Sequence, residues 1–339
     1  MHRLMAGVTI LEHELSELRL LVERQVGILL DCPNSVLAAH VADYLEKHEL
    51  ESPAALLEHL SAGDQDPALF AEFLDGVLNA TTGFFRHPGA MTALARQVVP
   101  QLLTRKTDDS PATLRIWSAG CGTGEEAYSI AMALCSALPS GSGNGNGSAN
   151  GSGNGAKGGN GRNGGIVDTA LTISGTKEWS IHIVGTDLLP SAVKVAERGL
   201  YPHSALAGLP PATIRSCFSK ISASAPNGST DAAAASNSSY LLVKPRIRSM
   251  VTFNTMNLIR PVYIGRFDCI FCMDVLPHLS RTQRSALIER LHLYLEPGGY
   301  LFVSQTEKLC VSNLNFRPET FDGYTVHRKP LAASAAYGR

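Results

Sequence analysis

The sequence contains no apolar run near the ~20 residues that a membrane-spanning helix needs. Its N-terminus also lacks a basic stretch followed by an apolar one, so we expect no secretory signal and a cytoplasmic protein. Net charge is nearly absent, because 29 Lys and Arg face 30 Asp and Glu. A formal charge of −1 excludes a general attraction to nucleic acid or to an anionic membrane, so any acidic partner must meet a local patch.

Cysteine is too scattered to form a disulfide framework. The chain has 7 cysteines without regular spacing, which is typical of a reducing compartment. Cys269 and Cys272 form a lone CxxC in an apolar segment, and a zinc site would need a second ligand pair, which we do not find. We therefore expect two buried thiols and no metal.

The chain has enough apolar material for a sizeable core, since 44 % of its 339 residues are hydrophobic, with a mean hydropathy of +0.03. Its first hundred residues show helical spacing. The apolar series are Leu11, Leu15, Leu18 and Val22; Leu37, Val41 and Leu45; and Leu69, Phe70, Phe73, Leu74 and Val77. Ser52-Pro53 and Asp66-Pro67 are typical of an N-cap followed by proline. We expect a small all-helical domain over residues 1–85.

From Leu114 onward, short apolar segments alternate with helical ones, which predicts a parallel sheet covered on both faces. Ser280 and Gln283 predict a capping box that opens a helix running to Leu295. Pro297-Gly298-Gly299 predicts the end of that helix before a strand from Tyr300 to Ser304. This second domain extends over residues 86–330.

Two stretches, residues 139–165 and 222–239, consist mainly of Gly, Asn, Ser and Ala. Neither can bury enough apolar surface to offset its ordering entropy, so we expect flexible surface insertions. The first insertion explains a long spacing. An acidic residue that binds ribose usually follows the glycine loop by roughly 20 residues, and without the insertion Asp187 falls at a comparable distance.

That glycine loop consists of Gly120, Gly122 and Gly124, between an apolar strand and a helix that begins at Glu125. Such a turn lets a small polar ligand approach the backbone and the free N–H groups of the helix, although tight βα connections use similar turns. A dinucleotide fingerprint places its third glycine three residues after the second. Here the interval is two, which favours S-adenosylmethionine over NAD.

Further motifs occur in one order along the chain from about Leu15 to Glu307, outside the two insertions. They are Thr82-Gly83-Phe84-Phe85-Arg86, the glycine loop with Glu125-Glu126-Ala127-Tyr128-Ser129, Val184-Gly185-Thr186-Asp187, Asn257-Leu258, Phe267 to Cys272, and Leu295 to Leu301. This set closely resembles the CheR family of S-adenosylmethionine-dependent glutamate methyltransferases of bacterial chemotaxis. The resemblance implies an α/β protein with a Rossmann-like methyltransferase sheet and the small N-terminal helical domain. It also implies a protein substrate, namely the cytoplasmic domain of a methyl-accepting receptor.

The resemblance assigns the first site residues. Arg86 positions the acceptor carboxylate beside the cofactor, since a guanidinium can grip a carboxylate through two parallel bonds. Thr82 contacts the cofactor, and Gly120 and Gly122 form its cradle. The remaining cofactor contacts are Glu125 or Glu126 at the methionyl ammonium, Asp187 at the ribose hydroxyls, and Asn257, Leu258, Asp274 and Val275 around the adenine. Asp187 can also act as the N-cap of the following helix, and whichever glutamate does not bind can balance the helix dipole.

The chain departs from the family at several positions. Asp274 stands where the family has Asn, so it can accept but not donate a hydrogen bond. His278 replaces an aromatic hydroxyl near the methyl transfer, and could contact the acceptor as a titrating group. Ala80 replaces another Asn, and the second N-terminal helix, around Val36 to Asp43, lacks the arginines that face an acidic receptor.

Two functions remain open. One is an active methyltransferase that modifies glutamate carboxylates of a protein. The other is a non-catalytic relative that binds S-adenosylmethionine or S-adenosylhomocysteine as an adaptor or sensor. Thr82, Arg86, the glycine loop and Asp187 favour the enzyme.

Overall fold

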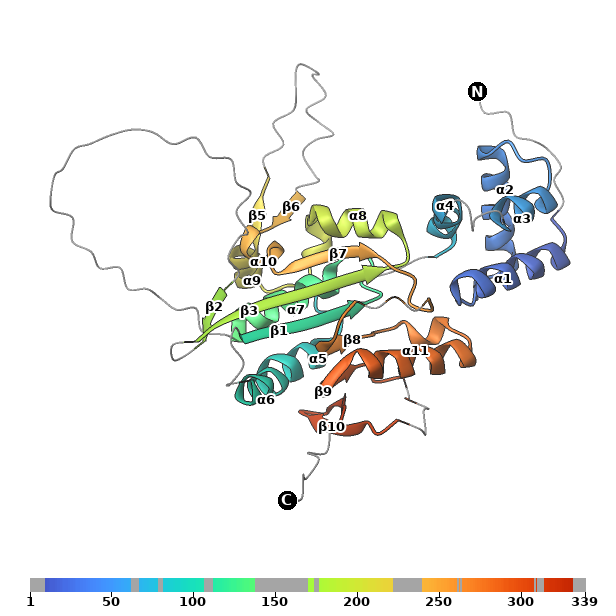
Figure 1. The fold of residues 1–339 in the computed structure, drawn as a ribbon. Helices are drawn as coiled ribbons and strands as arrows, with labels where there is room; N and C mark the ends of the chain where they lie inside the picture. The colour runs from blue at the N-terminus through green and yellow to red at the C-terminus, as the bar shows by residue number, and fades with distance from the viewer. Residues whose placement is uncertain are drawn as a thin grey trace, which may run out of the picture.

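The computed structural model describes residues 10–61, 67–78, 82–106, 112–137, 170–173, 177–221, 240–260, 262, 264–307, 309 and 314–331. It shows a helical N-terminal part beside a large mixed sheet (Figure 1). The predicted insertions at 139–165 and 222–239 lie outside the described residues, and so does Asp66. Among the described helices, none combines the length and apolar character that crossing a bilayer requires.

The N-terminal part contains four helices whose apolar stripes face one another. They are α1 (Glu12–Val26), α2 (Asn34–Lys47), α3 (Pro53–Ser61) and α4 (Pro67–Val77). The helical spacing predicted these elements correctly, because Leu18, Leu37 and Phe73 are buried in their common core. Ser52 caps α3, since its Oγ accepts a hydrogen bond from the backbone N–H of Ala55 at 3.2 Å.

The large sheet has the order β10-β11-β9-β8-β1-β3, with both β2 and β7 paired to the far edge of β3. Its strands are β1 (Ala112–Ala119), β2 (Ala170–Ile173), β3 (Lys177–Asp187), β7 (Val251–Thr255), β8 (Phe267–Phe271), β9 (Leu295–Phe302), β10 (Arg317–Phe321) and β11 (Tyr324–Arg328). Strands β9, β8, β1, β3 and β7 are parallel, as the continuous apolar runs predicted. From β1, the strand order runs through β3 to β7 on one side of the sheet and through β8 to β9 on the other. The strand order therefore reverses between β1 and β8. Ligands of open α/β sheets bind at this kind of crevice.

Helices cover both faces of the large sheet (Figure 1). The sheet domain has two hydrophobic cores, and a second, smaller sheet packs against one of them. The helical segments are α5 (Pro88–Ala93), η2 (Leu94–Val98), α6 (Val99–Arg105), α7 (Glu125–Ala137), α8 (Pro190–Arg198), η3 (His203–Leu206), α9 (Pro211–Cys217), α10 (Pro245–Arg248), η4 (Leu276–His278) and α11 (Arg281–Tyr294). The small sheet has the order β4-β6-β5, with β4 (Leu200–Pro202), β5 (Phe218–Lys220) and β6 (Tyr240–Val243). Cys269 and Cys272 are buried free thiols, and no metal-binding cluster occurs among the described residues.

The end of α11 differs from the sequence prediction. Ser280 caps the helix as expected, with its Oγ 3.5 Å from the backbone N of Gln283. The helix stops at Tyr294, however, and β9 already begins at Leu295, so Pro297-Gly298-Gly299 lies inside a strand that ends at Phe302. Gly298 has φ +77° and donates its N–H to the Lys329 carbonyl at 2.9 Å. Gly298 therefore lies where the register between β8 and β9 is irregular, and not at the end of a helix.

The helical part is attached to the sheet domain through the segment after α1. Ile28 and Leu279 form a β-bridge, and the Leu29 N–H donates to the His278 carbonyl at 2.8 Å. Gly27 ends α1 with φ +74°, and a Cβ there would lie 2.6 Å from Cγ2 of Ile259. This close approach places residues 26–32 at the carboxyl edge of the sheet.

Candidate functional site

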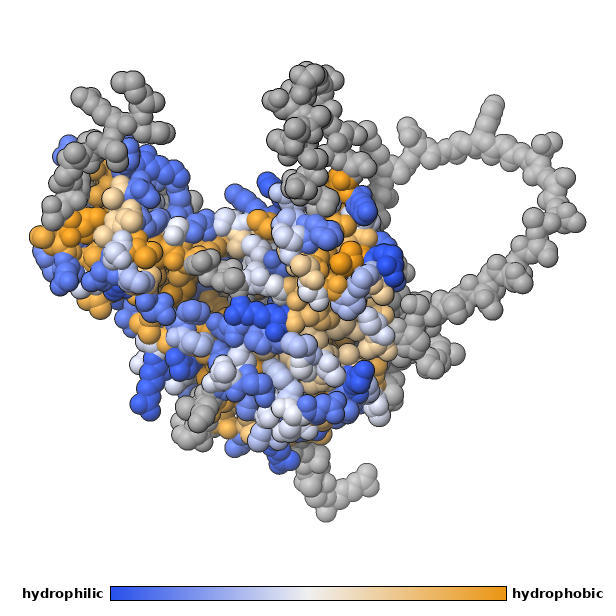
Figure 2. Space-filling view, turned by 180° about the vertical axis from the view of Figure 1, so that it is seen from behind, coloured by the Kyte–Doolittle hydropathy of each residue, from blue (hydrophilic) through white to orange (hydrophobic). Residues whose placement is uncertain are grey.

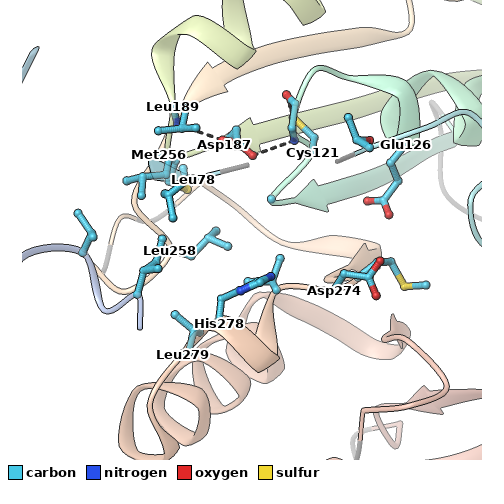
Figure 3. Close-up of a pocket in the computed structure, with 18 of the residues that line it drawn as sticks. Leu78, Cys121, Glu126, Asp187, Leu189, Met256, Leu258, Asp274, His278 and Leu279 are labelled. Carbon is cyan, nitrogen blue, oxygen red and sulfur yellow. Dashed lines mark hydrogen bonds between the residues drawn. The ribbon is translucent and has the colours of Figure 1, made fainter. Parts of the chain in front are cut away.

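A cavity of about 530 Å³ lies at the carboxyl ends of β1, β3 and β8. This volume falls within the roughly 300–1,000 Å³ of small-molecule sites. Figure 3 shows Asp187 and Cys121 along one side, His278 and Leu279 on another, and Glu126 and Asp274 at one end. The N-terminal part contributes a wall of mainly apolar side chains. These residues are Val26, Ile28, Leu29, Leu30, Val77 and Leu78.

The glycine loop lies directly against the opposite loop of the cavity. Gly120 has φ +81°, and a Cβ on it would lie 2.5 Å from Cγ2 of Val275. Gly122 has φ +55°, and a Cβ there would lie 3.3 Å from Cγ2 of Thr82. A side chain at Gly120 would clash with Val275, and one at Gly122 would crowd Thr82 in a backbone conformation that favours glycine. Gly120, Gly122, Thr82 and Val275, which the sequence analysis assigned to the cofactor, all line the cavity.

Asp187, the last residue of β3, organises the glycine loop. Its Oδ2 accepts a hydrogen bond from the Gly122 N–H at 2.8 Å, and its Oδ1 accepts one from the Leu189 N–H at 3.0 Å (Figure 3). Burial raises the pKa of Asp187, and these N–H donors partly oppose the rise. The alternative role of Asp187 as the N-cap of α8 is wrong, because the N-cap is Leu189, two residues later. Asp187 instead lines the cavity.

The two adjacent glutamates point in different directions. Glu126 lines the cavity, and its Oε1 accepts a hydrogen bond from Ser118 Oγ at 2.6 Å. Burial raises the pKa of Glu126 to about 7. Glu125 is 6 % exposed, and its Oε2 accepts a hydrogen bond from Thr123 Oγ1 at 2.6 Å. The geometry thus favours Glu126 for contact with a ligand, and Glu125 for stabilising the turn.

Arg86 reaches the cavity from a strained turn. Phe85 has φ +52°, which is rare for a bulky side chain, and its N–H donates to Ser129 Oγ at 2.9 Å. The ring of Phe84 packs edge-on against Tyr201, with 4.9 Å between the ring centroids. The next side chain, Arg86, lines the cavity and is 50 % exposed. Its Nε lies 3.2 Å from Oδ2 of Asp274.

Asp274 lies after β8 in a left-handed conformation, with φ +57°. Its Oδ2 also lies 2.8 Å from Nε2 of His87, while its Oδ1 accepts a hydrogen bond from Ser304 Oγ. Burial alone would raise the pKa of Asp274, but hydrogen bonds from Ser304 and His87 and the charges of His87 and Arg86 hold it below its ordinary value.

Asn257, Leu258 and His278 complete the cavity residues that the sequence identified. The Asn257 amide is engaged in the protein, since Nδ2 donates to the Gln25 carbonyl at 3.3 Å and Oδ1 accepts from the Ile259 N–H at 3.0 Å. Its side chain therefore shapes the loop that carries Leu258. His278 is exposed at the end of η4, on the side of the cavity next to the segment after α1.

The sequence prediction missed three parts of the site. The sequence could have indicated His87, because this residue follows Arg86 and precedes a proline, which is the position of an N-cap at the start of a helix such as α5. Ser304 reaches Asp274 only through the alignment of β8 with β9, and no local pattern indicates this contact. The wall from the N-terminal helices likewise depends on how two parts of the chain pack.

The donor set fits S-adenosylmethionine. A carboxylate at the end of β3 suits two ribose hydroxyls, and the partly buried carboxyl of Glu126 suits an ammonium group. The side-chain-free surface of Gly120 and Gly122 admits close approach of a ligand to the backbone. Apolar side chains around Leu258 suit the flat face of a base.

Solved structures with a similar chain course include methyltransferases. The glycopeptide N-methyltransferase MtfA, complexed with S-adenosylmethionine, is 14 % identical over 75 % of this chain and 72 % of its own, with a TM-score of 0.29. The N-methyltransferase NodS from Bradyrhizobium japonicum, in complex with S-adenosylhomocysteine, is 14 % identical over 66 % of this chain and 67 % of its own, with a TM-score of 0.28. Because these scores are low, the α/β assignment rests on the sheet order described above.

Curated relatives match over most of the chain. Chemotaxis protein methyltransferase 1 of Pseudomonas aeruginosa is 27 % identical over 86 % of this chain and 88 % of its own length. Chemotaxis protein methyltransferase of Vibrio parahaemolyticus is 25 % identical over 90 % of this chain and 92 % of its own length. A family model described as "CheR methyltransferase, SAM binding domain" matches residues 80–145 and 169–324. S-adenosylmethionine is therefore the cofactor, and the chain belongs to the CheR methyltransferase family.

Proposed function

We propose that this protein transfers a methyl group from S-adenosylmethionine to glutamate side-chain carboxylates of a protein, specifically of a chemotaxis-type receptor. The observation that carries the proposal is the position of Arg86, a half-exposed cation on the same cavity as Gly122 and Asp187. A guanidinium recognises a carboxylate without losing its own charge. The names of the curated relatives support a chemotaxis protein as the acceptor.

When bound, S-adenosylmethionine supplies a methyl group already activated by its sulfonium. A glutamate carboxylate is ionised at neutral pH, so the chain needs no general base to activate it. Its residues must instead hold the carboxylate in line and exclude water. We assign this task to Arg86, with His278 at the opposite side of the cavity as a second polar contact.

We assign the cofactor-binding roles to the cavity residues according to their chemistry. Asp187 accepts hydrogen bonds from the ribose hydroxyls, and Glu126 rather than Glu125 meets the ammonium group. Thr82 contacts the cofactor beside Gly122, while Leu258 and Val275 pack around the base. Asn257 supports Leu258 through the bonds that fix its loop.

The surface of the N-terminal helices, where we expect the acceptor protein to bind, is less basic than a site for an acidic receptor would be. Large apolar side chains are exposed on the N-terminal lobe, where Figure 2 shows orange atoms together with blue ones. Leu20 is 56 % exposed and Val36, in α2, is 54 % exposed. Helix α2 carries a single Lys and no Arg, so contact there would depend on apolar surface more than on charge.

A second candidate function is supported by the ion pair between Arg86 and Asp274. The Asp274 carboxylate lies 3.2 Å from Arg86 Nε and balances the positive charge that an acceptor carboxylate would meet. A chain that binds the cofactor without methyl transfer would act as an adaptor or sensor.

Transfer of tritiated methyl groups to purified cytoplasmic receptor domains tests both functions. We expect Arg86→Ala to abolish transfer while calorimetry shows little change in the affinity for S-adenosylhomocysteine, because the lost contact is with the acceptor. Arg96→Ala, on the exposed side of η2, is the control. Saturable cofactor binding without transfer to any receptor domain would refute the enzyme and support the adaptor.

A further inference from the structure

Two residues that line the cavity have left-handed backbone conformations. Phe85 has φ +52° immediately before Arg86, and Asp274 has φ +57° after β8. Such conformations persist where surrounding contacts determine them, and they concentrate at functional sites. The Phe85 N–H is fixed by Ser129 in α7, and the Asp274 N–H donates to Ser304 Oγ at 3.2 Å.

The Asp274 carboxylate joins these two segments. Its Oδ2 lies 3.2 Å from Arg86 Nε and 2.8 Å from His87 Nε2. Its Oδ1 accepts a hydrogen bond from Ser304 Oγ, so both oxygens of the carboxylate have protein partners. Contact at Nε, the nitrogen nearest the chain, limits rotation of the planar guanidinium, whose other N–H donors are on its two terminal nitrogens.

A second carboxyl lies near the same guanidinium. The charges of both Arg86 and Asp274 act on Glu126. Desolvation raises the pKa of the partly buried Glu126 to about 7, whereas hydrogen bonds and positive neighbours keep Asp274 ionised at neutral pH. Asp274 is therefore an ionised carboxylate in direct contact with Arg86, with Oδ2 at 3.2 Å from Nε.

We propose that Asp274 is a positioning residue that holds Arg86 in the orientation needed to receive the acceptor carboxylate. This inference rests on the proposed function and gives the departure from Asn a role. Asp274 acts through Arg86 rather than on the substrate or the cofactor. His87 and Ser304 fix the Asp274 carboxylate from two further sides.

Asp274→Asn is the main test, because Asn has similar size, tolerates the left-handed conformation and keeps an oxygen for Ser304. With saturating cofactor and acceptor, we expect kcat to fall about tenfold, while the Kd of S-adenosylhomocysteine changes less than about twofold. Ser304→Ala, which frees the other carboxylate oxygen, is expected to lower kcat in the same direction. Glu319→Gln removes the carboxylate of a different ion pair, with Arg328 at 3.1 Å, and is the control.

A double-mutant cycle separates positioning from general destabilisation. If Asp274 acts through Arg86, adding Asp274→Asn to Arg86→Lys should cost less than about twofold more in kcat. The Nε–Hε NMR signal of Arg86, identified by its absence in Arg86→Lys, should shift in Asp274→Asn. The same signal should stay in place in Glu319→Gln.

The proposal would be overturned if the kcat losses of the two single mutants multiplied in the double mutant. It would also be overturned if the Arg86 signal did not shift in Asp274→Asn. A tenfold weaker Kd for S-adenosylhomocysteine in Asp274→Asn would do so too, because it assigns Asp274 to the adenine. Absence of transfer by the unmodified protein would instead refute the proposed function, and this inference would fail with it. If the unmodified protein transfers methyl groups but the kcat losses multiply in the double mutant, only the role of Asp274 is refuted.

Discussion

Cofactor binding is expected to release a proton from Glu126. This glutamate lies in the first turn of α7 and is partly buried, its Oε1 accepts a hydrogen bond from the Ser118 hydroxyl at 2.6 Å, and desolvation raises its pKa from 4.5 to about 7. If it meets the ammonium group of the ligand, the bound state requires the ionised carboxylate. A positive group beside a carboxylate lowers its pKa, so the proton must leave as the ligand enters.

The size of the effect follows from that pKa of about 7. At pH 6 about nine in ten molecules hold the proton, and at pH 8 about one in ten. Binding should therefore release about 0.9 proton at pH 6 and about 0.1 at pH 8. Over the same range the affinity should rise roughly tenfold toward its plateau.

Titration calorimetry with S-adenosylhomocysteine, in buffers of different ionisation enthalpy, measures the released protons directly. Glu126→Gln should abolish the release and weaken binding at pH 8. Glu319→Gln is the control, because this carboxylate pairs with Arg328 and does not line the cavity. Equal proton release by Glu126→Gln and the unmodified protein would refute the assignment.

Three further predictions follow from particular contacts. Asp187→Ala should weaken S-adenosylhomocysteine binding by about 1.5–3 kcal/mol, or roughly 10- to 150-fold, and an unchanged Kd in calorimetry would exclude Asp187 from ribose binding. Gly27→Ala should lower the melting temperature more than Gly323→Ala. Both positions have positive φ, but only the first Cβ would meet another side chain, Ile259, at 2.6 Å, so equal losses would contradict that packing. Because the pKa of Glu307 is raised from 4.5 to about 7, the folded chain holds its proton more tightly than the unfolded chain. Its contribution is complete below pH 4.5 and is lost as the pH rises through 7, by about 2 kcal/mol after allowance for partial exposure. Unfolding experiments should show a smaller stability loss from pH 5 to pH 8 in Glu307→Gln, and an equal loss would contradict the linkage.

Local patterns predicted most of the fold. Helical spacing gave α1, α2 and α4, and apolar runs gave the parallel strands, because those signals depend on neighbours in sequence. Pro297-Gly298-Gly299 misled for the opposite reason. A backbone partner at Lys329, thirty residues onward, turns a usual helix stop into part of a strand.

The candidate site, like the fold, has parts that local sequence patterns predict and parts that depend on the three-dimensional arrangement. Motif and spacing predicted Arg86, Asp187 and the glycine loop as site residues, and Arg86, Asp187 and the first two glycines of the loop line the cavity. The choice of Glu126 over Glu125 required the direction of each side chain in the first turn of α7. Neighbouring glutamates in a helix point about 100° apart, and the sequence alone does not say which one faces a cavity.

The cavity has walls from both parts of the chain, and this has a consequence for how firmly they are joined. A ligand that touches both walls is lost when they separate, so its binding free energy opposes separation. At a free concentration 100 times its Kd, the added free energy is about 2.7 kcal/mol. The N-terminal helices, which carry no cofactor motif, would thus be docked more tightly when the methyl donor is abundant and would loosen as the supply runs down.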